Sequence, residues 1–287
     1  MDNEQDKQAA KRSLSVLSKM TTGSLPTDDG GLLMTVDEKV QLEAKYPALT
    51  RYIRPFIGAR EFLHDKVGEF SRYCLWFKDG NPSDYANIPE IKARFQRVKA
   101  IREHSKADRI QKMADYPYLF CQNRQPESTY LVIPRVSSET RKYIPIGFIS
   151  PDIIASDACI IIPDVSIYEF AVLTSSVHMA WVHIVAGRLK SDIRYSPAVY
   201  NNFVWLLPSE KQKAKIESAA QKILDVRTQI PDSSLADLYA PLTMPEELLK
   251  AHKANDAAVC EAYGWLKDIS EEEIVRKLFV LYHGLAG

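Results

Sequence analysis

The character of the sequence changes at Pro208. Between about Leu32 and Leu207, short helical patterns are mixed with short runs that are rich in β-branched and aromatic residues. Because the connections between these runs lack the regular strand–helix alternation of a doubly wound sheet, we expect an α+β fold with helices inserted among mixed strands. Four of these runs are bounded by Pro, Gly or Asp and are predicted as strands. They are RYCLWF (72–77), TYLVIPRV (129–136), YIPIGFI (143–149) and DACIIIP (157–163).

The sequence after Pro208 has the pattern of helices. Apolar residues recur at helical spacing, as in Ile216, Ala219 and Ile223. The capping patterns Ser209–Gln212 and Ser270–Glu273 each predict the start of a helix. Pro245 predicts the start of another helix, which Gly264 ends. We therefore predict an all-helical domain over residues 208–287, preceded by an α+β domain over 25–207. Residues 1–24 are predicted as a polar lead-in, followed by a linker at TTGSLPTDDGG.

The composition excludes several classes of protein. The 37 basic and 37 acidic residues cancel, which argues against a histone-like basic protein, although charge can still gather locally. No apolar run approaches the roughly 20 residues that span a bilayer, and the N-terminus lacks the apolar core of a secretory signal. The four cysteines lie far apart, which is typical of reduced thiols rather than of a disulfide framework or a zinc site. We expect a cytoplasmic protein with no membrane partner.

The sequence shows no self-sufficient catalytic site. It contains no glycine-rich nucleotide loop, and His178 and His183 are five residues apart rather than the four that place two metal ligands on one helical turn. DGNPSDY (79–85) lacks the second proline and the aromatic residue of an amino-methyltransferase motif, and we interpret it as a turn. We therefore predict no catalytic residue, no metal site and no cofactor in this chain.

Positive charge is concentrated between Lys92 and Lys112. Eight basic residues stand there against Glu103 and Asp108, a net of +6 in a chain whose total charge is zero. A solvated helix face is the ordinary explanation of such a run, but concentrated basic charge is also expected where a protein contacts phosphates. The residues predicted to share one helix face and to bind DNA phosphates are Lys99, Arg102, Lys106 and Arg109.

The stretch GRLKSDIRYS (187–196) places Lys190, Asp192 and Arg194 at every second position. In one continuous strand these three side chains would share a face, while Ile193 and Tyr195 would take the other. Two interpretations remain open from the spacing alone. The stretch is either a solvated strand face or a row of donors and acceptors that reads base edges in a DNA groove.

Long strings of the sequence resemble the target-recognition region of MmeI-like DNA methyltransferases, which are single-chain restriction–modification enzymes and their phage-defence relatives. The resemblance rests on residues 124–164, which include YLVIPRVSSE and ASDACIIIPD, and on residues 170–203, which include GRLKSDIRYS. YIRPFIGAREF (52–62) resembles the segment that follows the methyltransferase domain in that family. PSEKQKAKIESAAQKILDVR (208–227) and LLKAHKANDAAVCEAYG (248–264) resemble the family's C-terminal helical domain.

The resemblance implies which partners and cofactor to expect. In that family a nuclease, a helical spacer and a methyltransferase domain precede this region, the methyl donor is S-adenosylmethionine, and the target is the amino group of adenine. None of those motifs occurs in this chain, so the resemblance implies a C-terminal part of a longer protein. Its expected partners are double-stranded DNA and the methyltransferase domain of the same parent chain.

The family's base-reading positions match residues in three patches of this sequence, which are Arg135, Asp157 with Ala158, and Lys190 with Asp192 and Arg194. A Lys or Arg side chain can donate to the two acceptors of guanine in the major groove, and Asp can accept from the amino group of cytosine. Arg135 with Asp157 and Lys190 with Asp192 would then each suit a G·C pair.

We therefore predict that residues 25–207 form a DNA target-recognition domain of an adenine-specific DNA methyltransferase. Whether this chain has enzymatic activity by itself is left open. The alternative is a protein–protein scaffold or specificity subunit that takes no direct part in catalysis.

Overall fold

A computed structural model describes residues 18–230 and 232–286, and these divide into two compact units. Of the described residues, unit 1 contains 18–21, Ser128–Ile149 and those from Ile160 onward. Unit 2 contains Thr22–Glu127 and Ser150–Cys159. The predicted lead-in falls largely on residues 1–17, which lie outside the described residues.

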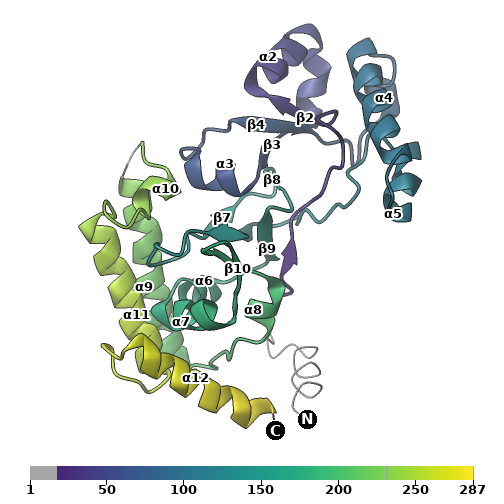
Figure 1. Cartoon of the computed structure of the whole chain (residues 1–287). Helices are drawn as coiled ribbons and strands as arrows, with labels where there is room; N and C mark the ends of the chain where they lie inside the picture. The colour runs from purple at the N-terminus through teal and green to yellow at the C-terminus, as the bar shows by residue number, and fades with distance from the viewer. Residues whose placement is uncertain (1–17, 231, 287) are drawn as a thin grey trace, which may run out of the picture. The chain divides into compact units, whose positions relative to one another are not determined.

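Unit 2 is built around a four-stranded sheet in the order β2-β4-β3-β8 (Figure 1). Strand β4 pairs antiparallel with both β2 and β3, whereas β3 and β8 are parallel. The strands of this sheet are β2 (Leu33–Thr35), β3 (Ile53–Ile57), β4 (Arg72–Leu75) and β8 (Ile154–Ala155). The predicted strand 72–77 is thus confirmed over its first four residues.

Helices α2 and α4 of unit 2 begin at residues that favour a helix start. Thr35 and Glu38 form a capping box at the start of α2, and Pro89 occupies the first turn of α4. Leu32, Ile91 and Val98 belong to the core that the helices share with the sheet. The helical segments are α2 (Val36–Lys45), η1 (Pro47–Tyr52), α3 (Ala59–His64), η2 (Pro82–Asp84), α4 (Pro89–Glu103), α5 (Asp108–Gln111) and η3 (Lys112–Asp115).

The predicted linker at residues 21–31 is wrong, because this segment is part of the folded core. The short strand β1 (Thr21–Thr22) begins it, and the Ser24 amide then donates to the carbonyl of Ala155 at 2.7 Å. Gly23 runs so close to the next backbone that a Cβ atom there would meet the Ser156 carbonyl oxygen at 2.3 Å. A flexible segment makes no such ladder contacts, and only glycine fits this approach.

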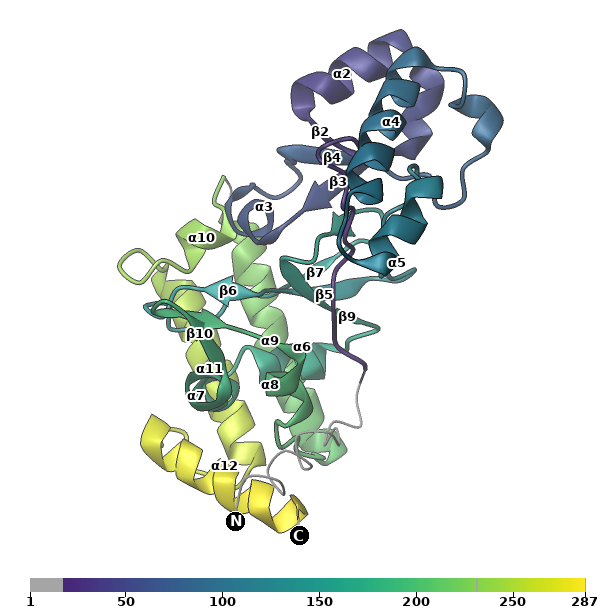
Figure 2. The ribbon, with the colours of Figure 1, turned by 45° about the vertical axis from the view of Figure 1, so that its right-hand side comes forward.

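Unit 1 contains two sheets. One has the order β1-β9-β5-β7, and the residues of β5 (Tyr130–Pro134) are all buried. The other has the order β10-β11-β6 and can be located in Figure 2 by the labels β6 and β10. The remaining strands are β6 (Val136–Ser137), β7 (Gly147–Ile149), β9 (Cys159–Pro163), β10 (Gly187–Leu189) and β11 (Asp192–Arg194). These mixed short strands and the intervening helices confirm the α+β class.

The C-terminal helices form as their caps predict. The Ser209 capping box opens α9, Pro245 precedes α11, and Gly264 follows its end with φ +74°. In both ribbon views α9 and α11 lie side by side, and the two helices pack together (Figures 1 and 2). The helices of unit 1 are α6 (Ile167–Leu173), α7 (Ser176–Val185), α8 (Pro197–Asn201), α9 (Glu210–Gln229), α10 (Leu235–Leu238), α11 (Glu246–Ala262) and α12 (Glu271–Ala286).

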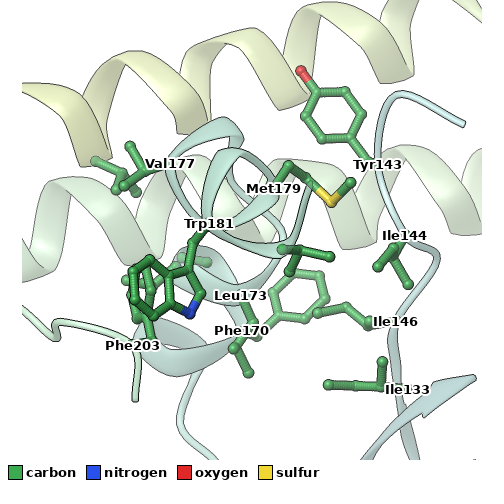
Figure 3. Packing of buried hydrophobic residues seen from close by; sticks show 14 of the residues in the cluster. Ile133, Tyr143, Ile144, Ile146, Phe170, Leu173, Val177, Met179, Trp181 and Phe203 are labelled. Carbon is green, nitrogen blue, oxygen red and sulfur yellow. The ribbon is translucent and has the colours of Figure 1, made fainter. Parts of the chain in front are cut away.

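One hydrophobic core joins these C-terminal helices to the strands and helices of unit 1. Figure 3 shows part of this core, where Phe170 of α6 and Trp181 of α7 lie among the apolar side chains. Ile223 of α9 and Leu248 of α11 are fully buried in the same cluster. The chain on both sides of Pro208 shares this core and belongs to the same compact unit.

The segment 143–146 shows why the predicted strand 143–149 is shorter than expected. Tyr143, Ile144 and Ile146 are buried against helices, and the Ile146 carbonyl accepts a hydrogen bond from Arg227 of α9 at 2.7 Å. A strand at this place would direct that carbonyl to a neighbouring strand. Only Gly147–Ile149 pairs as β7, with β5.

The described part of the chain contains no helix with both the length and the apolar character that a membrane span requires.

Candidate nucleic-acid interface

The stretch 187–196 folds as a hairpin and not as one continuous strand. Strands β10 and β11 pair antiparallel with Leu189 opposite Asp192, so Lys190 and Ser191 form a two-residue turn. Lys190 adopts φ +57°, which is the left-handed conformation that tight hairpin turns require at their first central residue. The prediction that Lys190 shares a strand face with Asp192 and Arg194 is therefore wrong.

The alternation of the second strand is as predicted. Ile193 and Tyr195 are buried, whereas Arg194 is exposed and Asp192 is half-buried. Antiparallel partners that stand directly opposite each other project from the same face, so Leu189 of β10 joins Asp192 on this outer face. Leu189 is 51% exposed. The hairpin therefore presents an acceptor, a donor and an apolar side chain on one accessible face.

Arg135 belongs to the same small sheet. It lies at the bend between β5 and β6, and its carbonyl accepts a hydrogen bond from the Tyr195 amide at 2.8 Å. Strand β6 continues the pairing, with Val136 opposite Arg194. Of the six predicted base-reading residues, the four in unit 1 are thus brought onto neighbouring strands and turns of one sheet.

A residue of α7 anchors the buried side of the hairpin. The Nε2 atom of His178 and the hydroxyl of Tyr195 are hydrogen-bonded at 2.8 Å, and both side chains are buried. Burial lowers the pKa of His178 to about 3, so the imidazole is neutral at physiological pH. A buried, neutral imidazole that anchors a strand has a structural role. Because Tyr195 is anchored in the core, strand β11 is held in place with Arg194 directed outward.

Asp157 and Ala158 lie in unit 2, in the turn that connects β8 to β9. The Asp157 amide donates to the Ser24 carbonyl at 3.1 Å, and the Ala158 amide donates to the Ser156 hydroxyl at 3.2 Å. Ala158 is exposed and Asp157 is half-buried. The segment around Ser24, predicted as a linker, in fact holds the backbone of this turn.

Arg102 does not belong to a phosphate-binding face, and that prediction is wrong. Its side chain is completely buried, and its five N–H groups donate to five backbone carbonyls within unit 2. The acceptors are the carbonyls of Pro26, Thr27, Met113, Tyr116 and Leu119. With all its donors used, Arg102 joins the chain around residue 27 to η3 and to the turn that follows it, residues 116–119.

Of the rest of the basic run, Arg94 is half-buried and pairs with Glu38 at 2.7 Å. The other basic residues are exposed, but they do not form one helical stripe. Helix α4 ends at Glu103, so Lys106 lies beyond it and Arg109 belongs to α5. Lys99 stays on α4, where its ammonium group lies 3.7 Å from Glu103. Lys99, Lys106 and Arg109 remain accessible cations on the surface of unit 2.

Sequence reasoning missed two neighbours of Asp192. Leu189 is one, because its place opposite Asp192 depends on the turn at Lys190. The other is Arg141, whose guanidinium lies near enough for the Asp192 charge to act on it. The alternation pattern extends only along one strand, so it contains no signal for a residue that another strand and a turn bring close.

Comparisons with known proteins identify the family. Residues 7–207 match the family model described as "MmeI, target recognition domain", and residues 208–287 match "MmeI, C-terminal domain". DNA methyltransferase A of Bacillus subtilis (strain 168) is 39% identical over 270 residues, which cover 94% of this chain and 30% of that protein.

A solved structure agrees with these matches. It is that of the type IIL restriction-modification enzyme MmeI in complex with DNA, with 40% identity and a TM-score of 0.91. The similarity covers 96% of this chain and 36% of that one, so the chain spans about a third of the length of these relatives. The chain belongs to the MmeI family, of which it carries the target recognition and C-terminal domains.

Proposed function

We propose that this chain recognises a specific sequence in duplex DNA as part of an adenine-specific, S-adenosylmethionine-dependent DNA methyltransferase of a restriction–modification or phage-defence system. The observation that carries the proposal is the anchored hairpin, which presents Asp192 and Arg194 outward while Ile193 and Tyr195 are buried. The solved structure of the relative MmeI is a complex with DNA, which supports duplex DNA as the partner.

The chemistry of the exposed groups suits base reading. Arg194 can donate to a purine in the major groove, and Asp192 can accept from the amino group of cytosine. Arg135 would donate to a guanine and Asp157 would accept from a cytosine amino group by the same chemistry. Lys99, Lys106 and Arg109 would contact phosphates, which position the protein without specifying sequence.

The chemical step belongs to the longer protein. We propose that its methyltransferase domain binds S-adenosylmethionine and receives the target adenine flipped out of the duplex, while the present chain holds the flanking bases. Such a protein would act on DNA in the cytoplasm. Labelled S-adenosylmethionine, mixed with DNA and the full-length protein, should give methylated adenine, and the present chain alone should give none.

The test of recognition is selection of bound duplexes from a randomised pool. The chain should retain a defined sequence, and Arg194→Ala should relax one position of it by about tenfold or more, since one good base contact contributes roughly 1–3 kcal/mol. Lys253→Ala, an exposed cation of α11, is the matched control for loss of one positive charge and should leave the selected sequence unchanged.

Two outcomes of this selection would contradict the proposal. A folded chain that enriches no sequence would refute recognition by this chain. A chain that binds no duplex at all at low salt would favour the protein–protein scaffold.

A further inference from the structure

A single carboxylate of the C-terminal helices holds two segments that flank the sheet β10-β11-β6. Asp256 lies on α11, within the residues that match the family's C-terminal domain, and is only 9% exposed. Its Oδ2 atom accepts a hydrogen bond from the Tyr143 hydroxyl at 2.7 Å, and its Oδ1 atom accepts one from the Ser176 amide at 2.7 Å. Both donors belong to the part that matches the target recognition domain, so Asp256 joins two separate segments of that domain to α11.

The hydrogen bond from Ser176 holds the start of α7. Ser176 is the first residue of this ten-residue helix, where backbone amides have no partner within the helix and the helix dipole favours a negative charge. Two positions further along, His178 is hydrogen-bonded to the Tyr195 hydroxyl. Because Tyr195 directly follows β11, the placement of α7 bears on the strand that carries Asp192 and Arg194.

The hydrogen bond from Tyr143 reaches the same strand through its neighbour β6. Strand β6 pairs with β11, and Tyr143 lies in the segment that follows β6. The Tyr143 ring stacks on His252 of α11 with 4.1 Å between the ring centroids, and Figure 3 shows its hydroxyl directed toward that helix. The Ile146 carbonyl accepts a hydrogen bond from Arg227 of α9 at 2.7 Å. Two C-terminal helices therefore hold the segment 143–146.

Stability alone does not explain a carboxylate at this place. Burial raises the pKa of Asp256, whereas the hydrogen bonds from Tyr143 and Ser176 act in the opposite direction. A charge is costly to bury, and a well-packed apolar residue of similar volume often stabilises a core equally well. A satisfied buried network differs from apolar packing because it fixes the distance and direction of the groups that it joins. The contribution expected of Asp256 is therefore the placement of these two segments.

We propose that Asp256 is a positioning residue for base reading. Through α7 and through the segment that follows β6, it holds β11 where Asp192 and Arg194 can meet base edges. Groups at a binding site have to be held within about 0.5 Å of their productive positions, so a small shift of the strand weakens discrimination. Asp256 itself contacts no base in this arrangement and acts through Tyr143 and Ser176. The inference rests on the proposed function, since it concerns the support of the same recognition surface.

The experiment is the selection from randomised duplexes, carried out with variants of the whole chain at a temperature where thermal unfolding shows each variant to be folded. Asp256→Ala removes both acceptors. It should lower the preference by about tenfold at the base pairs that Asp192→Ala and Arg194→Ala affect, because a misplaced contact loses much of its discrimination. Affinity for duplexes of unrelated sequence should stay the same, because phosphate contacts supply that binding.

Two further variants distinguish positioning from a general loss of stability. Val259→Ala is the matched control, because Val259 is a buried apolar residue of the same helix. Its replacement should lower the Tm and keep the selected sequence. Tyr143→Phe removes one of the two donors and should weaken discrimination at the same base pairs as Asp256→Ala. The double variant should discriminate no worse than Asp256→Ala alone, because both changes remove the same hydrogen bond.

The outcomes separate the inference from the proposed function. If the unsubstituted chain selects no sequence, the proposed function fails and this inference falls with it. If the chain is selective but Asp256→Ala keeps the selected sequence, or loosens it only as much as Val259→Ala does, the positioning role alone is overturned. Equal weakening at every position would overturn it as well. Should Asp256→Ala fail to fold, Tyr143→Phe decides by its discrimination at the base pairs that Asp192 and Arg194 read.

Discussion

Replacing Arg102 with Met should destabilise unit 2 and leave DNA contacts unchanged. Methionine retains most of the apolar stem but removes five donors, which leaves five backbone carbonyls of the core without their partner. Each buried acceptor left unsatisfied costs about 1–3 kcal/mol. Part of that sum is recovered, because the guanidinium no longer has to be desolvated and water reaches some of the carbonyls. We expect a net loss of about 3–5 kcal/mol, a large fraction of the roughly 5–15 kcal/mol typical of whole domains.

The assay combines urea unfolding with the salt dependence of duplex binding, and Lys99→Met is the matched control on the same helix. Lys99 is exposed, so its replacement should change stability by less than about 0.5 kcal/mol. If Lys99 contacts a phosphate, the log–log salt slope should fall by about 0.9, whereas Arg102→Met, measured where it is folded, should keep the slope. An Arg102→Met protein of unchanged stability with a reduced slope would refute the structural role.

Other predictions follow from the exposed cations, the buried histidine and the shared core. Replacing Lys106 and Arg109 together with Ala should weaken binding to all duplexes alike and lower the salt slope by roughly 1.8, as salt titrations would show. The pKa of His178 is lowered from 6.5 to about 3 in the folded protein, so below about pH 6.5 the unfolded chain binds a proton that the folded protein does not. The free energy of unfolding therefore decreases as the pH falls. Urea unfolding should show about 2 kcal/mol of this loss between pH 8 and pH 5, and His178→Gln should reduce it. Deleting residues 209–287 should yield an insoluble or unfolded chain, because it uncovers the core around Phe170; a soluble, cooperatively unfolding product would contradict the shared core.

Local chemistry was readable from the sequence. The capping pairs at Ser209 and Ser270 predicted the starts of α9 and α12, because a cap is satisfied within four residues of chain. The alternation that buries Ile193 and Tyr195 was likewise visible, since a strand repeats every two residues whatever surrounds it. The family resemblance, carried by long strings of residues, is confirmed by both family models.

Only the tertiary structure decided which of two similar side chains faces solvent. Lys99 and Arg102 lie three residues apart on one helix, yet Arg102 is buried because carbonyls from the segments 26–27 and 113–119 converge on it. The turn at Lys190 depends in the same way on the pairing of β10 with β11. Helix periodicity and strand alternation each describe a single segment, whereas these placements depend on contact with another segment, and a pattern along one segment does not contain them.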